Sequence, residues 1–309
     1  MNPQSASPIE TSAIALANKL VAKLASREVN VKHKYDYYNA DNDIPDFGIG
    51  TPIRMRNLTP GIGWASRAVN THSDRVVFDG FAKDTFGINS YLESINGYRI
   101  MANVKHDAFI AGCAFIAVAD DEETDRKILV PFTAQEATGE IDKTTGLLSC
   151  GLGVTRWAEP KPKKRGIRFA PADYVVFTPV YTATFIYREL VEIVPNPTGR
   201  TLLHPVTHRA SADRPLGKSR LSNTARRIIN EVGRLKRREE IAEEFYALPQ
   251  RYITGLAEGA KKDKSLDSAI GKVWAITKDE DGDKPDVGQL AQMSIDQFET
   301  SKKDKARDF

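Results

Sequence analysis

One long amphipathic segment constrains the fold of this chain more than any other feature. Apart from Gly233, it contains no glycine or proline between a turn at residues 215–217 and Pro249. Apolar residues recur along it at alternating steps of four and three, and only Glu239 interrupts them. These residues are Leu221, Ala225, Ile228, Val232, Leu235, Ala242, Phe245 and Tyr246. The spacing predicts a helix of roughly thirty residues, about 45 Å long, which either spans a large domain or packs against another subunit.

The opposite face of this predicted helix changes charge along its length. Its first half is basic and carries Arg226, Arg227, Arg234, Lys236, Arg237 and Arg238. Its second half is acidic and carries Glu239, Glu240, Glu243 and Glu244. A solvated face with its own ion pairs explains such a pattern, and so does a face that meets a neighbouring subunit or DNA. The candidate subunit-interface or DNA-facing residues are therefore Arg226, Arg227, Arg234, Arg237 and Arg238.

Length and composition predict a folded protein with at least one substantial core and two subdomains. The 309 residues are 41% apolar and 28% charged. The 44 basic and 41 acidic groups leave a formal net charge of +3, so contact with nucleic acid must come from local clustering. Cys113 and Cys150 lack the spacing of a metal site or disulfide framework, which indicates buried thiols in a reducing compartment. No apolar run approaches the roughly 18 residues that span a bilayer, so we expect no membrane partner.

The N-terminal third predicts helices joined by a polar loop. Thr11 or Ser12 is expected to cap a first helix, and a second helix is expected over residues 64–77. A cluster of tyrosines follows the first helix: Tyr35, Tyr37 and Tyr38. It leads into an extended loop at residues 39–50, which are rich in Asp, Asn, Gly and Pro. The tyrosines are expected to pack half-buried at a subunit or domain edge, although aromatic clusters also stack on bases.

The middle third predicts mainly strands. After a helix over residues 90–109 that breaks near Gly97, two runs rich in Val, Ile and Phe predict a β-hairpin at residues 113–119 and 127–132. Further strands are expected at residues 147–157, 166–169, 174–177 and 181–194. Between them, residues 159–165 form a basic loop, which is either a solvated hairpin tip or a phosphate contact. Strands in the middle and helices at both ends predict an α+β fold.

Two motifs that suggest a catalytic or metal site fail on inspection. Residues 217–219 resemble the end of a phosphate-binding loop, but Ala212 stands where its first glycine is required. His204 and His208 are four residues apart, yet Pro205 between them favours extended structure. The histidines therefore form no recognisable nucleophile or metal arrangement.

The acidic stretch near the C-terminus also fails as a metal site. Asp279, Asp281 and Asp283 have the first three ligand spacings of a calcium loop. Lys284 stands where the loop needs glycine, and Leu290 stands where it needs a bidentate glutamate. This stretch is interpreted as an acidic surface turn. We therefore expect no enzyme, no catalytic residue, no cofactor and no metal.

The order of short motifs around the long helix is similar to that of one known family. Residues 213–221 precede the helix with a Gly-x-Ser turn, and residues 244–255 follow it with Pro249-Gln250-Arg251. Looser matches occur at residues 35–38, 77–81, 274–276 and 281–289. In this order the chain, from about residue 20 to about residue 289, resembles the portal proteins of tailed bacteriophages of the siphophage type. No single motif is diagnostic, and the order carries the resemblance.

The resemblance implies a structural role rather than a catalytic one. Portal subunits assemble into a dodecameric ring at one capsid vertex, nucleate head assembly, connect head to tail and form the channel for genome packaging and ejection. The implied partners are further copies of the chain, the terminase motor, a head–tail adaptor, the major capsid or scaffolding protein, and the double-stranded DNA in the channel. The implied location is the portal vertex of the virion, and the host cytoplasm during assembly.

The family layout assigns a role to each part of the chain. Residues 1–205 correspond to a mixed α/β wing, 206–270 to a long helix and stem region, 271–293 to a clip, and 294–309 to the truncated start of a second stem helix or a polar tail. The candidate motor or tail docking residues are Trp274, Asp279, Asp281 and Lys284. Family members continue beyond this point through further stem, wing and crown, so we expect a truncated product or a separately encoded remainder.

A second hypothesis comes from a different functional class. The basic helix face and the lysine-rich loop also suit a phage protein that binds or hydrolyses nucleic acid. A ring subunit needs long rigid helices and complementary lateral surfaces, and a helix with opposite charges at its two ends can pair with its neighbour. The ordered motifs and the failed catalytic motifs favour the ring subunit.

Overall fold

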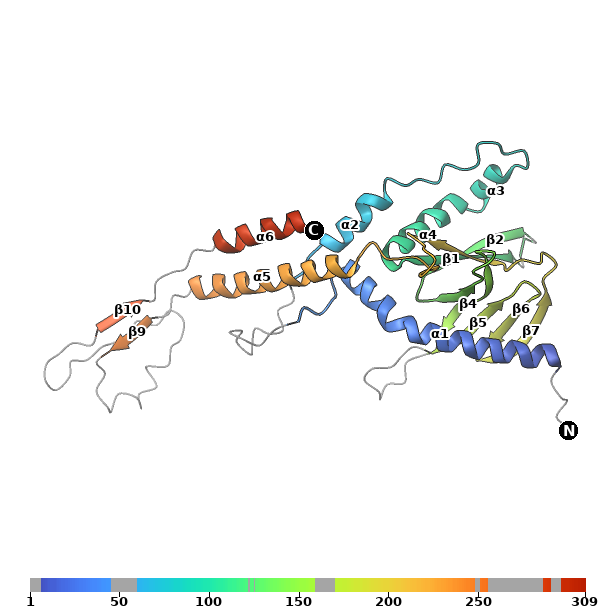
Figure 1. Cartoon of the computed structure of the whole chain (residues 1–309), viewed down its shortest axis with the longest axis horizontal. Coiled ribbons are helices and arrows are strands. Elements are labelled where there is room, and N and C mark those ends of the chain that lie inside the picture. The colour runs from blue at the N-terminus through green and yellow to red at the C-terminus, as the bar shows by residue number, and fades with distance from the viewer. Residues whose placement is uncertain are drawn as a thin grey trace, which may run out of the picture. The chain divides into compact units, whose positions relative to one another are not determined.

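The computed structural model describes residues 7–45, 60–121, 123–124, 126–158, 170–247, 251–254, 286–289 and 296–309. It divides into two compact units, whose helices and strands are labelled in Figure 1. The sheet unit comprises Met1–Asn42 and Gly63–Arg226, and the helical unit comprises Asp43–Ile62 and Arg227–Phe309. The expected division into wing, stem and clip stays a prediction.

Helix α1, Pro8–Asn39, is longer at both ends than the sequence analysis predicted. Ser7, rather than Thr11 or Ser12, is its N-cap, because the Ser7 hydroxyl accepts the Glu10 N–H at 3.3 Å and the Glu10 carboxylate accepts the Ser7 N–H at 2.7 Å. The helix ends where Ala40 adopts a left-handed φ of 60°. The expectation that the tyrosine cluster follows the first helix is therefore wrong, because the cluster occupies the last turns of α1.

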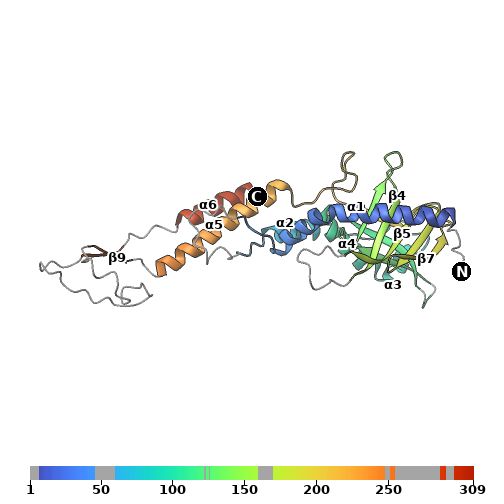
Figure 2. The same cartoon turned by 90° about the horizontal axis from the view of Figure 1, so that it is seen from below.

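A five-stranded antiparallel sheet forms half of the sheet unit, with the order β3-β4-β5-β6-β7. Its strands are β3 Ala137–Ile141, β4 Leu148–Trp157, β5 Pro171–Phe177, β6 Tyr181–Ile186 and β7 Glu189–Pro195. Helix α1 lies along this sheet in both views (Figure 1, Figure 2). Alternate strand residues such as Cys150, Leu152 and Val154 pack against Ala17 and Leu20 of the helix. This period of two is what places one face of the sheet in the core.

A three-stranded antiparallel sheet has the order β2-β1-β8, from β1 Cys113–Asp121, β2 Arg126–Phe132 and β8 Leu203–Thr207. The predicted β1–β2 hairpin is confirmed. Phe115 and its alternate neighbours enter one core cluster, whereas Ile116 packs against Val104 and Ala108 of a helix on the other face. Both faces of β1 are therefore buried. Pro205 lies in the edge strand β8, where its missing N–H is tolerated.

Three shorter helices complete the sheet unit: α2 Trp64–Ser73, α3 Ile88–Ser94 and α4 Gly97–Ala111. The predicted break near Gly97 is confirmed, and the side chain of Leu92 leaves no room for a Cβ there, at 2.6 Å. The predicted helix at residues 64–77 ends earlier, at Ser73. Together with the two antiparallel sheets, these helices confirm the α+β fold class.

One predicted strand proved to be two. Residues 181–194 were expected to form a single strand, but β6 and β7 pair with each other in a hairpin. The turn places Tyr187 at φ 50° and Arg188 at φ 69°, both left-handed and neither a glycine. The carboxylate of Asp173 accepts the Tyr187 N–H at 2.9 Å, and Arg156 lies 4.4 Å from the centre of the Tyr187 ring. These long-range contacts hold a turn that lacks the usual Asn-Gly sequence.

The helical unit contains α5 Asn223–Ala247, whose first turn belongs to the sheet unit, and α6 Asp296–Asp308. Between them in the sequence, β9 Arg251–Thr254 pairs antiparallel with β10 Asp286–Gln289. Two of the motif segments that carry the family resemblance therefore meet in this strand pair. Among the described residues, no helix combines the length and the apolarity that crossing a bilayer requires.

Candidate assembly and nucleic-acid interface

The segment before α5 is fixed to the end of α4. The Ser219 hydroxyl donates to the carbonyl of Ile110 and accepts the Leu221 N–H at 3.0 Å. The helix then starts at Asn223, because Ser222 caps it by accepting the Ala225 N–H at 3.1 Å. Ser219 therefore lies outside the helix, which begins at Asn223 within the predicted segment.

The former candidate phosphate loop is part of the same anchor. Gly217 has φ +76°, and a Cβ there would lie 2.3 Å from the carbonyl oxygen of Gly112. The Lys218 N–H donates to the His208 carbonyl at 2.8 Å, and the Gly217 N–H donates to Arg214. Two backbone donors that would cradle a phosphate, those of Gly217 and Lys218, are thus bonded within the chain. This supports the rejection of the loop as a nucleotide site.

The two histidines at a spacing of four do not meet. His204 pairs with Ile116 in β8, so the extended structure expected around Pro205 is confirmed. The Nδ1 of His208 lies 2.7 Å from the Lys218 carbonyl oxygen, and its ring packs on Phe109. Burial lowers the pKa of both histidines. Within the described residues, no three His, Cys, Asp or Glu side chains gather as a metal site.

The apolar stripe of α5 is buried at Ile228 and Val232 and half-buried at Ala225, Leu235 and Ala242, and burial extends around more of the helix. Ile228 and Val232 lie on the predicted stripe, and Ile229 and Ile241 are buried beside it. Within the helical unit, Gly233 allows the side chain of Ile44 to approach, because a Cβ would lie 2.3 Å from its terminal carbon. The side chains of Phe245 and Tyr246 lie outside the described part.

Glu239, which interrupts the stripe, is buried and paired. Only 8% of the residue is exposed, and the Nζ of Lys302 in α6 lies 2.9 and 2.8 Å from its two carboxylate oxygens. A second ion pair joins Glu231 to Lys305 at 2.7 Å. The later residue of α5, Glu239, pairs with the earlier residue of α6, Lys302, so the two helices run antiparallel. They lie side by side in both views (Figure 1, Figure 2). The hydrogen bond from Lys305 lowers the pKa of Glu231.

The candidate arginines divide into buried and exposed ones. Arg237 is 4% exposed, and its guanidinium donates to the Ile44 carbonyl at 3.4 Å, so it lies inside the helical unit rather than on the predicted solvent face. In the sheet unit, the half-buried Arg226 lies over the Tyr37 ring, 5.8 Å from its centroid. Arg227 and Arg238 are exposed, and Arg234 is half-buried.

The remaining arginines share one face of α5. Steps of seven and four residues separate Arg227, Arg234 and Arg238, so all three lie within about 40° around the helix axis. They extend over roughly 16 Å of helix length. We call these three residues the arginine stripe. Its two exposed members, Arg227 and Arg238, are the exposed arginines of the predicted basic face.

The docking candidates Trp274, Asp279, Asp281 and Lys284 lie outside the described residues, and so does the basic loop at residues 159–165. The chain matches no family model, and a search of curated proteins finds no match. Any functional conclusion therefore rests on the geometry of the chain.

Sequence reasoning missed a polar network beneath α1. Arg27 donates to the Thr138 hydroxyl at 3.1 Å and to the buried sulfur of Cys113 at 3.4 Å. The Tyr35 hydroxyl lies 3.4 Å from Asp107, and burial raises the pKa of that carboxyl to about 6. Both cysteines are free and buried, as predicted. The network could not be read from the sequence because its partners lie on separate elements.

The tyrosine cluster packs against neighbouring helices. Tyr37 is buried, whereas Tyr35 and Tyr38 are half-buried. The Tyr38 hydroxyl donates to Asn70 at 3.0 Å and lies 3.0 Å from the Nε2 of His106. The preference for packing over base stacking is therefore supported by the positions of these side chains.

Proposed function

We propose that this chain is a structural portal subunit of a tailed-phage capsid. The observation that carries the proposal is the helical unit: α5 and α6 run antiparallel, joined by ion pairs, and the strand pair β9–β10 lies between them in the sequence. A stem of two helices with a small clip between them has this order of elements. The α+β sheet unit corresponds in the same way to a wing.

The chemistry of the α5–α6 pair suits a stem. Its two interhelical ion pairs use Glu231 and Glu239 of α5 and two lysines of α6, so each of these glutamates is engaged within the chain. Arg227 and Arg238 of the arginine stripe are exposed. An outward stripe of one sign fits a lateral contact with an acidic surface of a neighbouring copy.

The proposal includes the partners that such a subunit has. The chain forms a homo-oligomeric ring of twelve copies at the portal vertex of the virion. It meets the terminase motor and then a head–tail adaptor through its clip, including Trp274, Asp279, Asp281 and Lys284. It contacts the major capsid or scaffolding protein through its wing. Double-stranded DNA passes through the channel, and the role requires no catalysis.

A second candidate function rests on the arginine stripe alone. The two exposed guanidinium groups on this helix face, those of Arg227 and Arg238, can contact phosphates, as in a protein that binds nucleic acid. Hydrolysis is the weaker part of this alternative, because the backbone N–H groups of Gly217 and Lys218 are already bonded to the chain.

One double variant separates the two functions. Arg227→Glu with Arg238→Glu reverses two exposed charges of the stripe, and Arg67→Glu with Arg99→Glu on α2 and α4 makes the same charge change elsewhere. For a ring subunit, sedimentation should show weaker assembly of the first variant only. Added salt should weaken the unmutated assembly too, because exposed pairs are screened over about 10 Å.

The DNA-binding alternative gives the opposite pattern. Assembly would be unchanged, and the log–log dependence of DNA affinity on salt would flatten by about one unit for each phosphate that the variant no longer neutralises. Unchanged sedimentation together with collapsed DNA affinity would overturn the portal proposal.

A further inference from the structure

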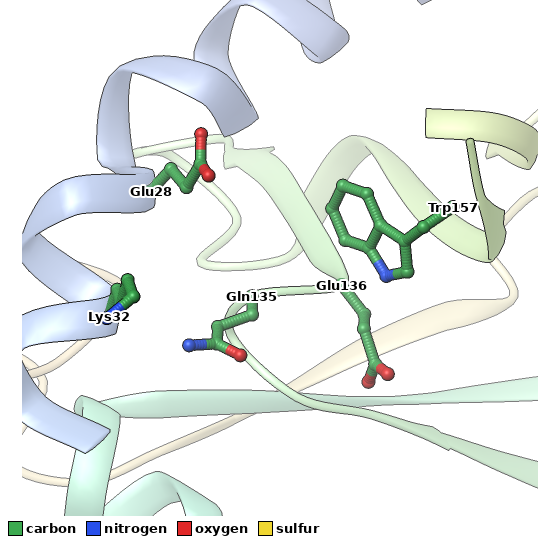
Figure 3. Close-up of a pocket in the computed structure, with 5 residues that line it drawn as sticks. All are labelled: Glu28, Lys32, Gln135, Glu136 and Trp157. Atoms are coloured by element: carbon green, nitrogen blue, oxygen red, sulfur yellow. The ribbon is translucent and has the colours of Figure 1, made fainter. Parts of the chain in front are cut away.

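A pocket of about 320 Å³ opens between α1 and the end of β4 in the sheet unit. It is lined by Glu28, Lys32, Gln135, Glu136 and Trp157. Figure 3 shows Glu28 extending from α1 toward the side on which Trp157 stands, with Gln135 and Glu136 below on the loop before β3. Lys32 is exposed and Glu28 is half-buried, so the pocket is reached from solvent. Its volume suits a group of side-chain size.

A break in the strand register aims Trp157 at this pocket. Leu152 and Val154 face the core on alternate positions of β4, so unbroken alternation would turn Arg156 inward. The pairing of β4 with β5 shifts between Val154 and Arg156 and again between Arg156 and Trp157. As a result Arg156 pairs outside with Asp173 at 2.6 Å, whereas Trp157 packs against the core cluster under α1. The bulge therefore gives the pocket a rigid aromatic wall.

Among the described residues that line the pocket, the charges sum to a negative value. The Nζ of Lys32 lies 2.9 Å from both carboxylate oxygens of Asp36, so these two charges offset each other. One oxygen of Glu136 is held by the N–H and the hydroxyl of Thr133, both at 2.9 Å. Glu28 has no hydrogen-bond or ion-pair partner among the described residues. The pocket therefore has an indole on one side and the available carboxylate of Glu28 on another, whereas the carboxylate of Glu136, held by Thr133, points away from the indole (Figure 3).

A guanidinium group satisfies all of these features. It stacks on an indole, it takes a carboxylate in a bidentate hydrogen bond, and its alkyl stem lies on apolar surface. An ammonium group stacks less well and binds a carboxylate as a point charge. We propose that this pocket binds the arginine side chain of a partner protein. The site is independent of the proposed ring and of the arginine stripe.

Titration of the full chain with N-acetyl-arginine amide tests the site, with tryptophan fluorescence and calorimetry as readouts. The neutral isostere N-acetyl-citrulline amide should bind at least about tenfold more weakly, since it loses the charge-assisted bonds. Glu28→Gln should weaken arginine binding by a similar factor, and Trp157→Leu should remove the fluorescence change. Glu93→Gln, an exposed glutamate of α3, should leave binding as it is.

Two results would overturn the proposal. One is equal affinity for the citrulline and arginine compounds; the other is arginine binding that survives both Glu28→Gln and Trp157→Leu in calorimetry. Methylguanidinium, which lacks the alkyl stem and the peptide groups, should bind more weakly than the blocked arginine. Equal binding would mean that the pocket takes a free guanidinium compound rather than a protein side chain. Thermal unfolding shows whether Trp157→Leu remains folded, and Glu28→Gln tests the site without touching the core.

Discussion

Removing the amine of Lys302 should detach α6 from α5. Glu239 is only 8% exposed, and in the Lys302→Met variant its carboxylate loses the two hydrogen bonds from Nζ, at 2.8 and 2.9 Å. Breaking a fully buried ion pair costs about 3–5 kcal/mol, because the remaining charge is left without a partner. The Lys302 side chain is 23% exposed, which lets water reach the pair. We therefore expect a loss of about 2–3 kcal/mol.

Hydrogen exchange is the suitable assay, since a chain of two units need not unfold in one step. The expected loss corresponds to a roughly 30- to 150-fold fall in the protection of the α6 amides. Lys303→Met is the matched control, because Lys303 is exposed and makes no ion pair within the described residues. It should leave the protection of α6 nearly unchanged.

The double variant Glu239→Leu with Lys302→Met completes the test. Removing both charges leaves no buried carboxylate alone, so protection should return to within about 1 kcal/mol of the unmutated chain. The double-mutant cycle should then give a coupling of about 1–3 kcal/mol. If Lys302→Met leaves α6 as protected as the Lys303→Met control does, the ion pair does not hold the two helices together and our reasoning is refuted.

Three further predictions concern stability. Gly217→Ala should lower the free energy of unfolding by about 3 kcal/mol or more, because the new Cβ would meet backbone atoms. Gly199→Ala, also at positive φ but in open space, should lower it by only about 1 kcal/mol. Equal losses in thermal unfolding would refute the close approach at Gly217. The pKa of Asp107 is raised to about 6, so its contribution to stability is fully present below about pH 4 and is lost as pH rises through 6. The Asp107→Asn variant should therefore be as stable as the unmutated chain at pH 4 and up to about 2 kcal/mol more stable at pH 8. Urea titrations at the two pH values check this. Val232→Asp should cost several kcal/mol by burying an unpaired carboxylate, and an unchanged melting temperature would contradict the buried stripe.

Local periodicity predicted much of the fold. The stripe on α5, the β1–β2 hairpin and the break near Gly97 follow from spacing and from glycine, which act within a few residues. The β6–β7 turn could not be predicted, because contacts from Asp173 and Arg156 hold Tyr187 and Arg188 at positive φ. Strand β3 was missed because it is short and carries Thr, Gly and Glu.

Only part of the candidate site could be predicted from the sequence. A helix pattern predicts which residues share a face, but it does not say how many faces are covered. Arg237 was assigned to the outer face, and it is buried because the segment around Ile44 covers that side of α5. The partner of Glu239 lies 63 residues further along the chain, a separation at which no local pattern operates. The pocket beside Trp157 depends on a register shift between β4 and β5, which the sequence pattern also does not predict.

The most direct test of the central proposal is electron microscopy of the purified full chain, with particles scored for closed rings that have a central hole. The portal proposal predicts rings of uniform size, which dissociate in the Arg227→Glu, Arg238→Glu variant and persist in the Arg67→Glu, Arg99→Glu control. A sample that remains monomeric at every protein and salt concentration, or that forms only open filaments, would contradict it.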